Sequence, residues 1–264
     1  MDIVNYLTRP FFNYLPSDLA AIGAAMVWGQ KQQLSPLQYQ IFQKTGLLHL
    51  LVLSGQNITL LVGFFNGLGG IIGYRIKLTL TILVALFYLV VFHGDPPIVR
   101  ASLMAIYSAL VIFQQKFTPP LYVLGFITVL LLAIFPAWLT SVSFWLSVSA
   151  TAGIYLFYPY FQRKYRFRSG LAQTFFLSLS AQILTTPILL LVFRELPLLT
   201  LPMNILVAWL VEPIMFFGVL MSLFGQIIQP VTQALAFIMF GLLQIMNYIV
   251  LIGYQVGERW MMRI

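Results

Sequence analysis

The sequence predicts an all-α membrane protein, a polytopic bundle of about eight spanning helices preceded by short interfacial helices. Its composition is 61% hydrophobic and only 8% charged, whereas soluble domains carry about 25% charged residues. The mean hydropathy is +0.95. Apolar stretches of about 20 residues, the length that a spanning helix needs, follow one another without a polar linker that could hold a second domain. We therefore expect one transmembrane domain over residues 1–264, with interfacial helices in 1–44 and the bundle in 46–252.

Residues that are missing or rare exclude several kinds of chemistry. The chain has no cysteine, which excludes disulfides and thiolate catalysis, and its two histidines are too few for a histidine-rich metal site. No glycine-rich phosphate loop of the Walker type is present, so we do not expect this chain to hydrolyse ATP. We predict no metal, no cofactor and no catalytic residue. The net charge of +8 indicates an anionic partner only weakly, because membrane loops are commonly basic.

The first 44 residues are expected to form short helices. Ser17 and Asp18 are placed to cap an apolar helix that runs to Gly29, and this helix is too short to cross a hydrocarbon core of about 30 Å. It is therefore expected to lie in the interface or to pack on the bundle. Residues 35–38 have the Ser-Pro-x-Gln pattern of a capping box, which predicts a second short helix that ends at 45–46.

Hydropathy predicts the spans, and the basic loops predict their orientation. The loop at 163–168 holds four basic residues, which places it in the cytoplasm. Counting outward puts Arg75, Lys77 and Lys116 on the same side and both chain ends on the far side. The predicted spans are 46–68, 76–93, 96–113, 118–135, 137–161, 171–193, 198–224 and 230–252.

The central segment 45–65, TGLLHLLVLSGQNITLLVGFF, is expected to contain a broken helix near Gly55. A glycine costs about 1 kcal/mol relative to alanine in a helix interior, and polar side chains in hydrocarbon need internal partners. Unwound backbone at membrane depth is tolerated only where it is buried in protein or lines a cavity. The segment therefore supplies the first candidate functional residues: His49, Ser54, Gly55, Gln56 and Asn57.

Further candidates lie in the later spans. Arg100 is either an arginine that snorkels to the headgroups or a phosphate contact, because its planar fork binds phosphate oxygens bidentately. Asn204 and Gln182 are expected to form interhelical hydrogen bonds or to face a cavity. Glu212 is costly in lipid when charged, so we expect it to be protonated or paired with a basic residue such as Arg100. Helix breaks or kinks are predicted at Gly94, Pro97, Pro136, Pro187 and Pro202.

Five motifs in order over residues 30–215 give the sequence a family resemblance. Taken together, they resemble the competence domain of the ComEC family of bacterial DNA-uptake channels. In that family a histidine often stands where this chain has Asn57, and Glu212 is unusual for the pattern. The matching stretches are TGLLHLLVLSGQNITLL (45–61), HGDPPIVRASLMA (93–105), FPAWLTSVSFWLSVSATAGI (135–154), SAQILTTPILL (180–190) and LPMNILVAWLVEP (201–213).

The resemblance implies a channel of the bacterial cytoplasmic (inner) membrane that moves single-stranded DNA into the cytoplasm during natural transformation. The implied partners are the strand itself, the lipid bilayer and separate competence proteins: a DNA receptor, an ATP-driven motor and a nuclease. The nuclease and oligonucleotide-binding domains common in the family have no counterpart in this sequence, and the family's homodimer is left open. The resemblance gives His49, Ser54 and Gly55 a structural role in shaping the broken helix.

Two other functions remain open from the residues alone. A secondary transporter for a small anionic solute would use the same broken helices and Arg100. An intramembrane serine protease would need Ser54 beside a histidine. However, Ser54 lies five positions after His49, about 140° around a helix, so the two would not meet on one regular face. A histidine bonded to a backbone carbonyl is the expected state of His49.

Overall fold

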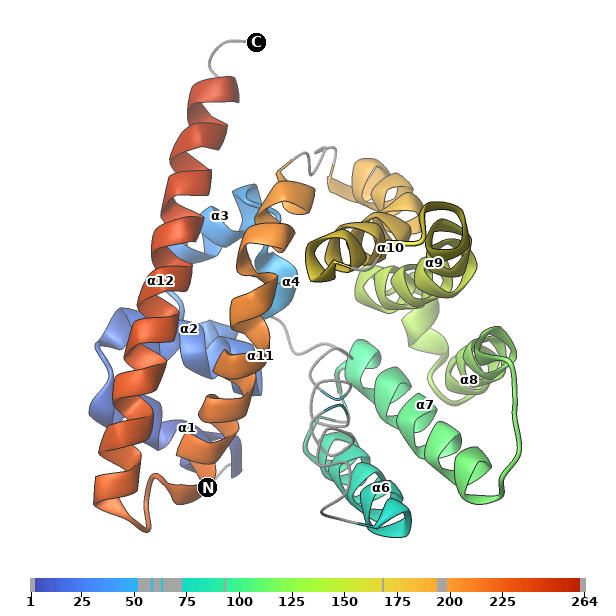
Figure 1. The fold of residues 1–264 in the computed structure, drawn as a ribbon, viewed down its shortest axis with the longest axis horizontal. Helices are drawn as coiled ribbons and strands as arrows, with labels where there is room; N and C mark the ends of the chain where they lie inside the picture. The colour runs from blue at the N-terminus through green and yellow to red at the C-terminus, as the bar shows by residue number, and fades with distance from the viewer. Residues whose placement is uncertain are drawn as a thin grey trace. The chain divides into compact units, whose positions relative to one another are not determined.

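The computed structural model describes residues 3–51, 58, 63, 73–92, 94–167, 169–193 and 199–261, and this part of the chain is entirely helical apart from its turns. Figure 1 shows the helices in chain order. They form two compact units. Unit 1 combines Met1–Leu53 with Pro197–Ile264, and unit 2 is Ser54–Leu196. The all-α class predicted from composition is confirmed for the described residues.

Five of the described helices are long and apolar enough to cross a membrane. Two shorter apolar helices, α2 (Ser17–Trp28) and α8 (Pro120–Ile134), fall below that length. The predicted count of eight spans therefore stays a prediction, and most of the predicted span 46–68 lies outside the described residues. The five long helices are α6 (Tyr74–Val91), α7 (Pro96–Phe113), α10 (Gly170–Phe193), α11 (Thr200–Phe224) and α12 (Gln229–Met261).

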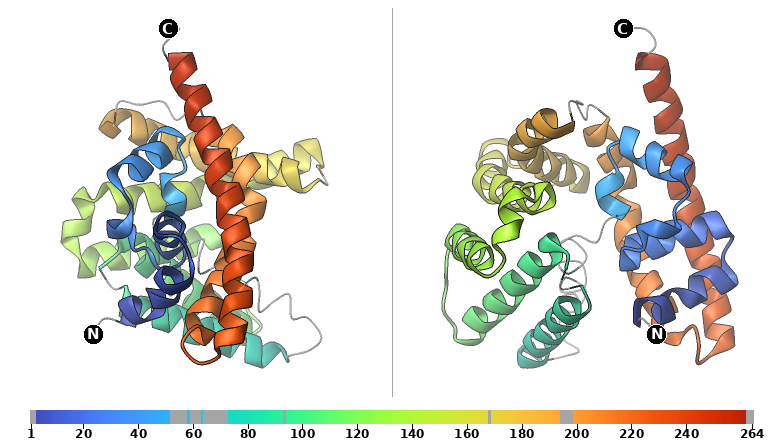
Figure 2. Two further views of the ribbon diagram at one scale, coloured as in Figure 1. Left: turned by 90° about the vertical axis from the view of Figure 1, so that its left-hand side faces the viewer. Right: turned by 180° about the vertical axis from the view of Figure 1, so that it is seen from behind.

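Unit 1 is built around α2. This helix is buried from Leu19 to Trp28 because its alanines and Gly23 let α1 (Ile3–Tyr14), α11 and α12 approach closely. The ring of Phe11 is fully buried and fills the space that Gly23 of α2 and Gly218 of α11 leave open. Figure 2 shows α11 and α12 side by side along their length. The small residues thus hold these helices together, because helices in lipid associate by close packing and not by the hydrophobic effect that acts in water.

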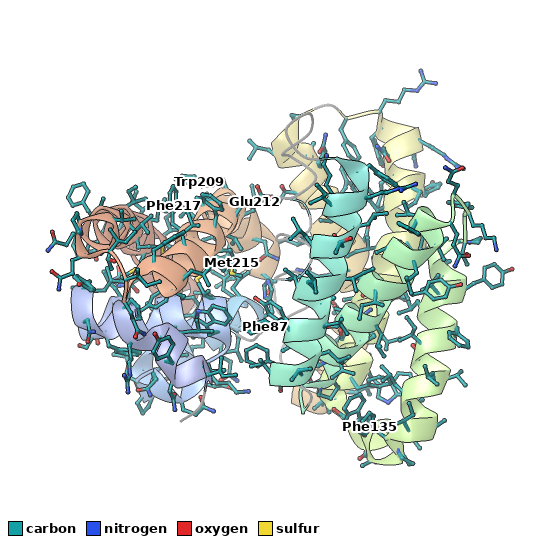
Figure 3. All side chains as sticks on the ribbon, turned by 90° about the horizontal axis from the view of Figure 1, so that it is seen from below. Phe87, Phe135, Trp209, Glu212, Met215 and Phe217 are labelled. Atoms are coloured by element: carbon teal, nitrogen blue, oxygen red, sulfur yellow. The ribbon has the colours of Figure 1, made fainter. Side chains whose placement is uncertain are left out.

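A buried hydrogen bond joins α2 to α11. Trp28 Nε1 donates to Ser222 Oγ at 2.7 Å, and Ser222 Oγ donates in turn to the Gly218 carbonyl at 2.9 Å. The two sides of α11 differ in exposure. Figure 3 shows Trp209, Glu212 and Phe217 on the outer side of the helix, whereas Met215 is buried. The outer side of α11 therefore carries the costly carboxylate, and the inner side carries the contacts that hold unit 1 together.

The N-terminal caps match the sequence at one helix and differ at another. Ser35 and Gln38 form the predicted capping box of α3 (Pro36–Lys44). The expectation that Ser17 and Asp18 cap α2 is wrong, because Pro16 occupies the capping position and no side chain bonds the free N–H groups there. Pro16 has the extended backbone of a capping residue, and its carbonyl accepts from Ala20 N at 2.8 Å. The predicted end at Gly29 is confirmed, with φ of 69°.

Unit 2 is a run of antiparallel neighbours: α6, α7, α8, the 3-10 helix η2 (Pro136–Thr140), α9 (Val142–Tyr165) and α10. Three of its helices begin at prolines, α7 at Pro96, α8 at Pro120 and η2 at Pro136, where a missing N–H costs nothing. The tightest pairing is α9 against α10, where Gly153 meets the backbone of Ser180. The core between α7, α8 and α9 consists of Val99, Met104, Val123, Leu124, Ile127, Leu131 and Phe144.

The basic segments of unit 2 meet at one end of it. Tyr74 Oη at the start of α6 donates to the Ile112 carbonyl at the end of α7, at 3.2 Å. The connection 114–119 is short, so α8 begins at that end as well, and α9 returns to it after the turn at η2. Arg75, Lys77 and Lys116 therefore lie at the end of unit 2 where α9 finishes in Arg163 and Lys164.

Candidate functional site

Arg100 is a buried cation near the beginning of α7. Only 5% of the side chain is exposed. Its Nε donates to Ser147 Oγ on α9 at 3.1 Å, and its Nη1 lies 3.0 Å from Met104 Sδ, one turn further along α7. The guanidinium therefore points deeper along α7 and across to α9. A snorkelling side chain would instead extend past the beginning of the helix toward the headgroups.

The charge on Arg100 has weak acceptors around it. A hydroxyl and a thioether sulfur are its partners, and sulfur is a poor hydrogen-bond acceptor. No carboxylate among the described residues pairs with it. Asp95 is the only acidic residue described in unit 2, and it precedes α7. Glu212 lies in unit 1, so its expected pairing with Arg100 stays a prediction. A buried charge is costly unless it is paired, which makes Arg100 a candidate contact for an anion.

A second polar group forms in unit 1, where α11 begins. His49, in the short helix α4 (Leu48–Leu51), bonds through Nδ1 to the Gly46 carbonyl at 3.0 Å, as expected for a histidine bonded to the backbone. Its ring also reaches the side chain of Asn204 on α11. The structure thus brings close together two candidates that lie far apart in the sequence.

Gly46 and Thr200 complete this group, and the candidate residues did not include them. Gly46 has φ of +74° in the turn between α3 and α4. A Cβ there would overlap Thr200 Oγ1 and would lie 2.8 Å from Thr200 Cβ and 3.1 Å from its Cα. Thr200 is 8% exposed, and its hydroxyl has no hydrogen-bond partner among the described residues. The Thr-Gly pair at 45–46 signalled the turn, but nothing in the sequence signalled Thr200.

The remaining candidates have varied positions. Gln182 lies on α10 with its Nε2 buried and without a partner in the described part of the chain, so its predicted interhelical bond is not found there. Gly94 and Pro97 lie at the interruption between α6 and α7, and Pro136 begins η2. Four candidates lie outside the described residues: Ser54, Gly55, Gln56 and Asn57.

Two of the prolines predicted to break or kink a helix lie within helices that continue past them. Pro187 lies inside α10, which continues through it to Phe193. Pro202 is the third residue of α11, where its missing N–H would have no intrahelical acceptor in any case. Proline ends a helix only where the lost hydrogen bond and the ring clash are not accommodated, and membrane helices accommodate them more readily than soluble ones.

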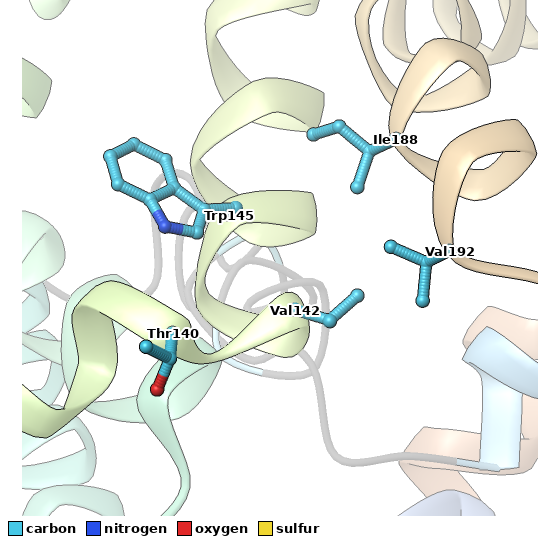
Figure 4. A pocket seen from close by; sticks show the side chains of 5 residues that line it. All are labelled: Thr140, Val142, Trp145, Ile188 and Val192. Carbon is cyan, nitrogen blue, oxygen red and sulfur yellow. The ribbon is translucent and has the colours of Figure 1, made fainter.

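A shallow apolar hollow of about 340 Å³ lies between the start of α9 and the end of α10. Figure 4 shows the five side chains that line it: Thr140, Val142, Trp145, Ile188 and Val192. The indole N–H of Trp145 is already bonded to the Leu139 carbonyl at 2.8 Å. The hollow thus offers apolar surface and no charged group, which does not suit an anionic solute.

The apolar helices, the small residues packed between them and the buried polar groups define a polytopic helical membrane protein. Comparison with known families then identifies the family to which the chain belongs. Residues 26–256 match the competence protein family, and the chain belongs to that family. This confirms the resemblance seen in the five sequence motifs.

Two relatives show how far the similarity extends. The chain is 29% identical over 202 residues to ComE operon protein 3 of Bacillus subtilis, covering 73% of this chain and 25% of that protein. It is 33% identical over 149 residues to an uncharacterized protein of Aquifex aeolicus, covering 52% of this chain and 33% of that protein. The matches therefore span a quarter and a third of these relatives. No solved structure matches the chain.

Proposed function

We propose that this chain conducts single-stranded DNA across the bacterial inner membrane during natural transformation, and that it does so without bond chemistry. Membership of the competence protein family supports the process. The single structural observation that supports an anionic cargo is Arg100, a buried cation held by a hydroxyl and a sulfur. DNA capture, strand degradation and ATP hydrolysis would be supplied by other parts of the uptake machinery.

The distribution of charge agrees with an anionic cargo. Unit 2 contains nine basic and two acidic residues, whereas unit 1 contains five basic and four acidic residues. From residue 96 to residue 194 the sequence has no aspartate or glutamate. Arg100 therefore lies in the unit with the larger positive charge, where a phosphate backbone would meet little repulsion.

Deleting the gene should separate DNA binding from DNA entry. We expect the deletion strain to bind labelled double-stranded DNA at its surface and to admit none to the cytoplasm, because this chain supplies passage and not capture. Complementation with the intact gene is the control. Normal transformation in a deletion strain without a paralogue would refute the proposal, and saturable uptake of a small anion by vesicles with no response to DNA would support a transporter instead.

The orientation in the membrane can be tested with single cysteines, because the chain contains none. We expect the segment 163–168 to face the cytoplasm and both termini to face outward, since basic loops are retained on the cytoplasmic side. Ser169→Cys and Gln162→Cys replace exposed, uncharged side chains beside this segment and leave its basic residues in place. Both should resist an impermeant maleimide in intact cells and react after lysis. Labelling of either cysteine in intact cells would show that the segment faces outward and that the predicted orientation is wrong.

A further inference from the structure

Five aromatic rings gather where α9 ends and α10 begins, and we call them the aromatic tip: Tyr158, Phe161, Tyr165, Phe167 and Phe176. Phe176 lies at the centre. Phe167 stacks on it with centroids 4.8 Å apart and planes at 10°, and Tyr165 stacks on it at 5.1 Å and 17°. Phe161 also lies 5.1 Å from Phe176, and Tyr158 lies 5.9 Å from Phe167. The rings thus form one continuous group of contacts within unit 2, with two of them stacked on Phe176.

Cations surround the aromatic tip. Lys164 Nζ lies 5.4 Å from the ring of Tyr165 and 5.7 Å from the ring of Tyr160, and it donates to Tyr160 Oη at 3.4 Å. This hydrogen bond raises the pKa of Lys164, so the ammonium stays charged at neutral pH. Arg163 and Arg166 are exposed beside it. Tyr160 is 56% exposed and Tyr165 is 53% exposed, so both rings are open to a ligand.

The backbone at this position is held in an unfavourable conformation. Arg166 has φ of 45°, the left-handed region that glycine adopts easily and arginine does not. This residue ends α9 and turns the chain back, so that Phe167 reaches Phe176. An arginine where glycine would relieve strain indicates that the charge has a use of its own, because strain is commonly retained at functional positions.

We propose that the aromatic tip and its flanking cations bind single-stranded DNA at the basic end of unit 2; this inference rests on the proposed function. Single strands are bound without sequence preference by rings on which bases stack and by cations that follow the backbone. Anionic lipid is the competing ligand, because rings and lysines also occur at membrane interfaces. The rings here gather in one place, and Tyr165 of the aromatic tip and the neighbouring Tyr160 are open, an arrangement that matches a stacking surface.

The test is binding of a fluorescent oligo-dT to the purified full-length protein in nanodiscs of zwitterionic lipid, measured by anisotropy. Tyr165→Leu and Tyr160→Leu should each weaken binding by about tenfold, the size of the loss of one stacked base. Tyr248→Leu is the matched control, since Tyr248 is 65% exposed on α12 in unit 1, and its affinity should not change. Melting temperatures of all three variants show whether each one is folded.

Arg166→Gly separates charge from structure. It removes a cation and relieves the positive φ, so we expect a higher melting temperature together with a salt dependence of binding that is shallower by about 0.7 in the log–log slope. Unchanged oligo-dT affinity in the folded tyrosine variants would overturn the inference. The inference would also be overturned if wild-type protein did not bind oligo-dT in zwitterionic nanodiscs. If Tyr165→Leu and Tyr160→Leu then weakened binding to vesicles of anionic lipid, the aromatic tip would be assigned to lipid.

The inference and the proposed function can fail separately. If the tyrosine variants bind oligo-dT as tightly as the wild type and the deletion strain takes up no DNA, the inference is wrong and the proposed function stands. If these variants bind oligo-dT more weakly and the deletion strain still takes up DNA, the aromatic tip binds DNA but the protein is not the channel.

Discussion

Arg100→Leu should abolish DNA uptake while the protein remains folded and its thermal stability is unchanged or higher. Arg100 is 5% exposed, and a hydroxyl and a thioether are the described partners of its guanidinium. Replacing a buried charge by an apolar side chain of similar size is often neutral or stabilising. If the charge is there to meet a phosphate, its removal improves packing and ends function. Transformation frequency and the melting temperature of the purified protein measure the two effects.

Two variants control for packing at this position. Met104→Leu keeps the volume and removes the sulfur that faces Nη1, so uptake should stay near the wild-type level. Arg100→Lys keeps the charge and loses the planar fork that binds Ser147, so uptake should be intermediate. A melting temperature that falls in Arg100→Leu, together with uptake that falls only in proportion to the protein level, would show that Arg100 is a structural residue.

Gly153→Leu should separate α9 from α10 and destabilise unit 2. A Cβ at Gly153 would overlap the Ser180 carbonyl oxygen and would lie 3.3 Å from its carbonyl carbon and 3.4 Å from Ala181 Cα. Backbone atoms cannot move aside as a side-chain end can, so the helices must part. We expect the free energy of unfolding to fall by an amount at or above the upper end of the ~1–3 kcal/mol that overpacking usually costs. The stability of Gly153→Ala should lie between those of the wild type and Gly153→Leu.

The matched control for this variant is Gly125→Leu on α8. Gly125 is also a glycine inside a helix of unit 2, but a Cβ there would meet nothing within 4 Å. Both changes gain the same helix propensity, so the difference between them isolates the contact with Ser180. Melting temperature and membrane level report it. Equal melting temperatures for Gly153→Leu and wild type would show that α9 and α10 do not pack through this glycine.

The sequence predicted the parts of the fold that depend on short stretches of chain. The capping box at Ser35 and the end of α2 at Gly29 are correct, because the residues that satisfy a helix terminus are its immediate neighbours. The membrane class followed from composition, and the family followed from five ordered motifs. Ser17 was wrong as a cap because serine suits more than one position at the start of a helix.

The packing of the helices determines which distant residues meet, and the sequence did not reveal these pairs. Arg100 bonds Ser147, and His49 reaches Asn204, across intervals that no local pattern spans. The aromatic tip exists because α9 and α10 pack through Gly153 and because the chain reverses at Arg166. Hydrophobicity fixes which segments enter the membrane, since burial of apolar surface depends little on direction. Hydrogen bonds and ring stacks depend on distance and angle, so their partners are set only when the helices have packed.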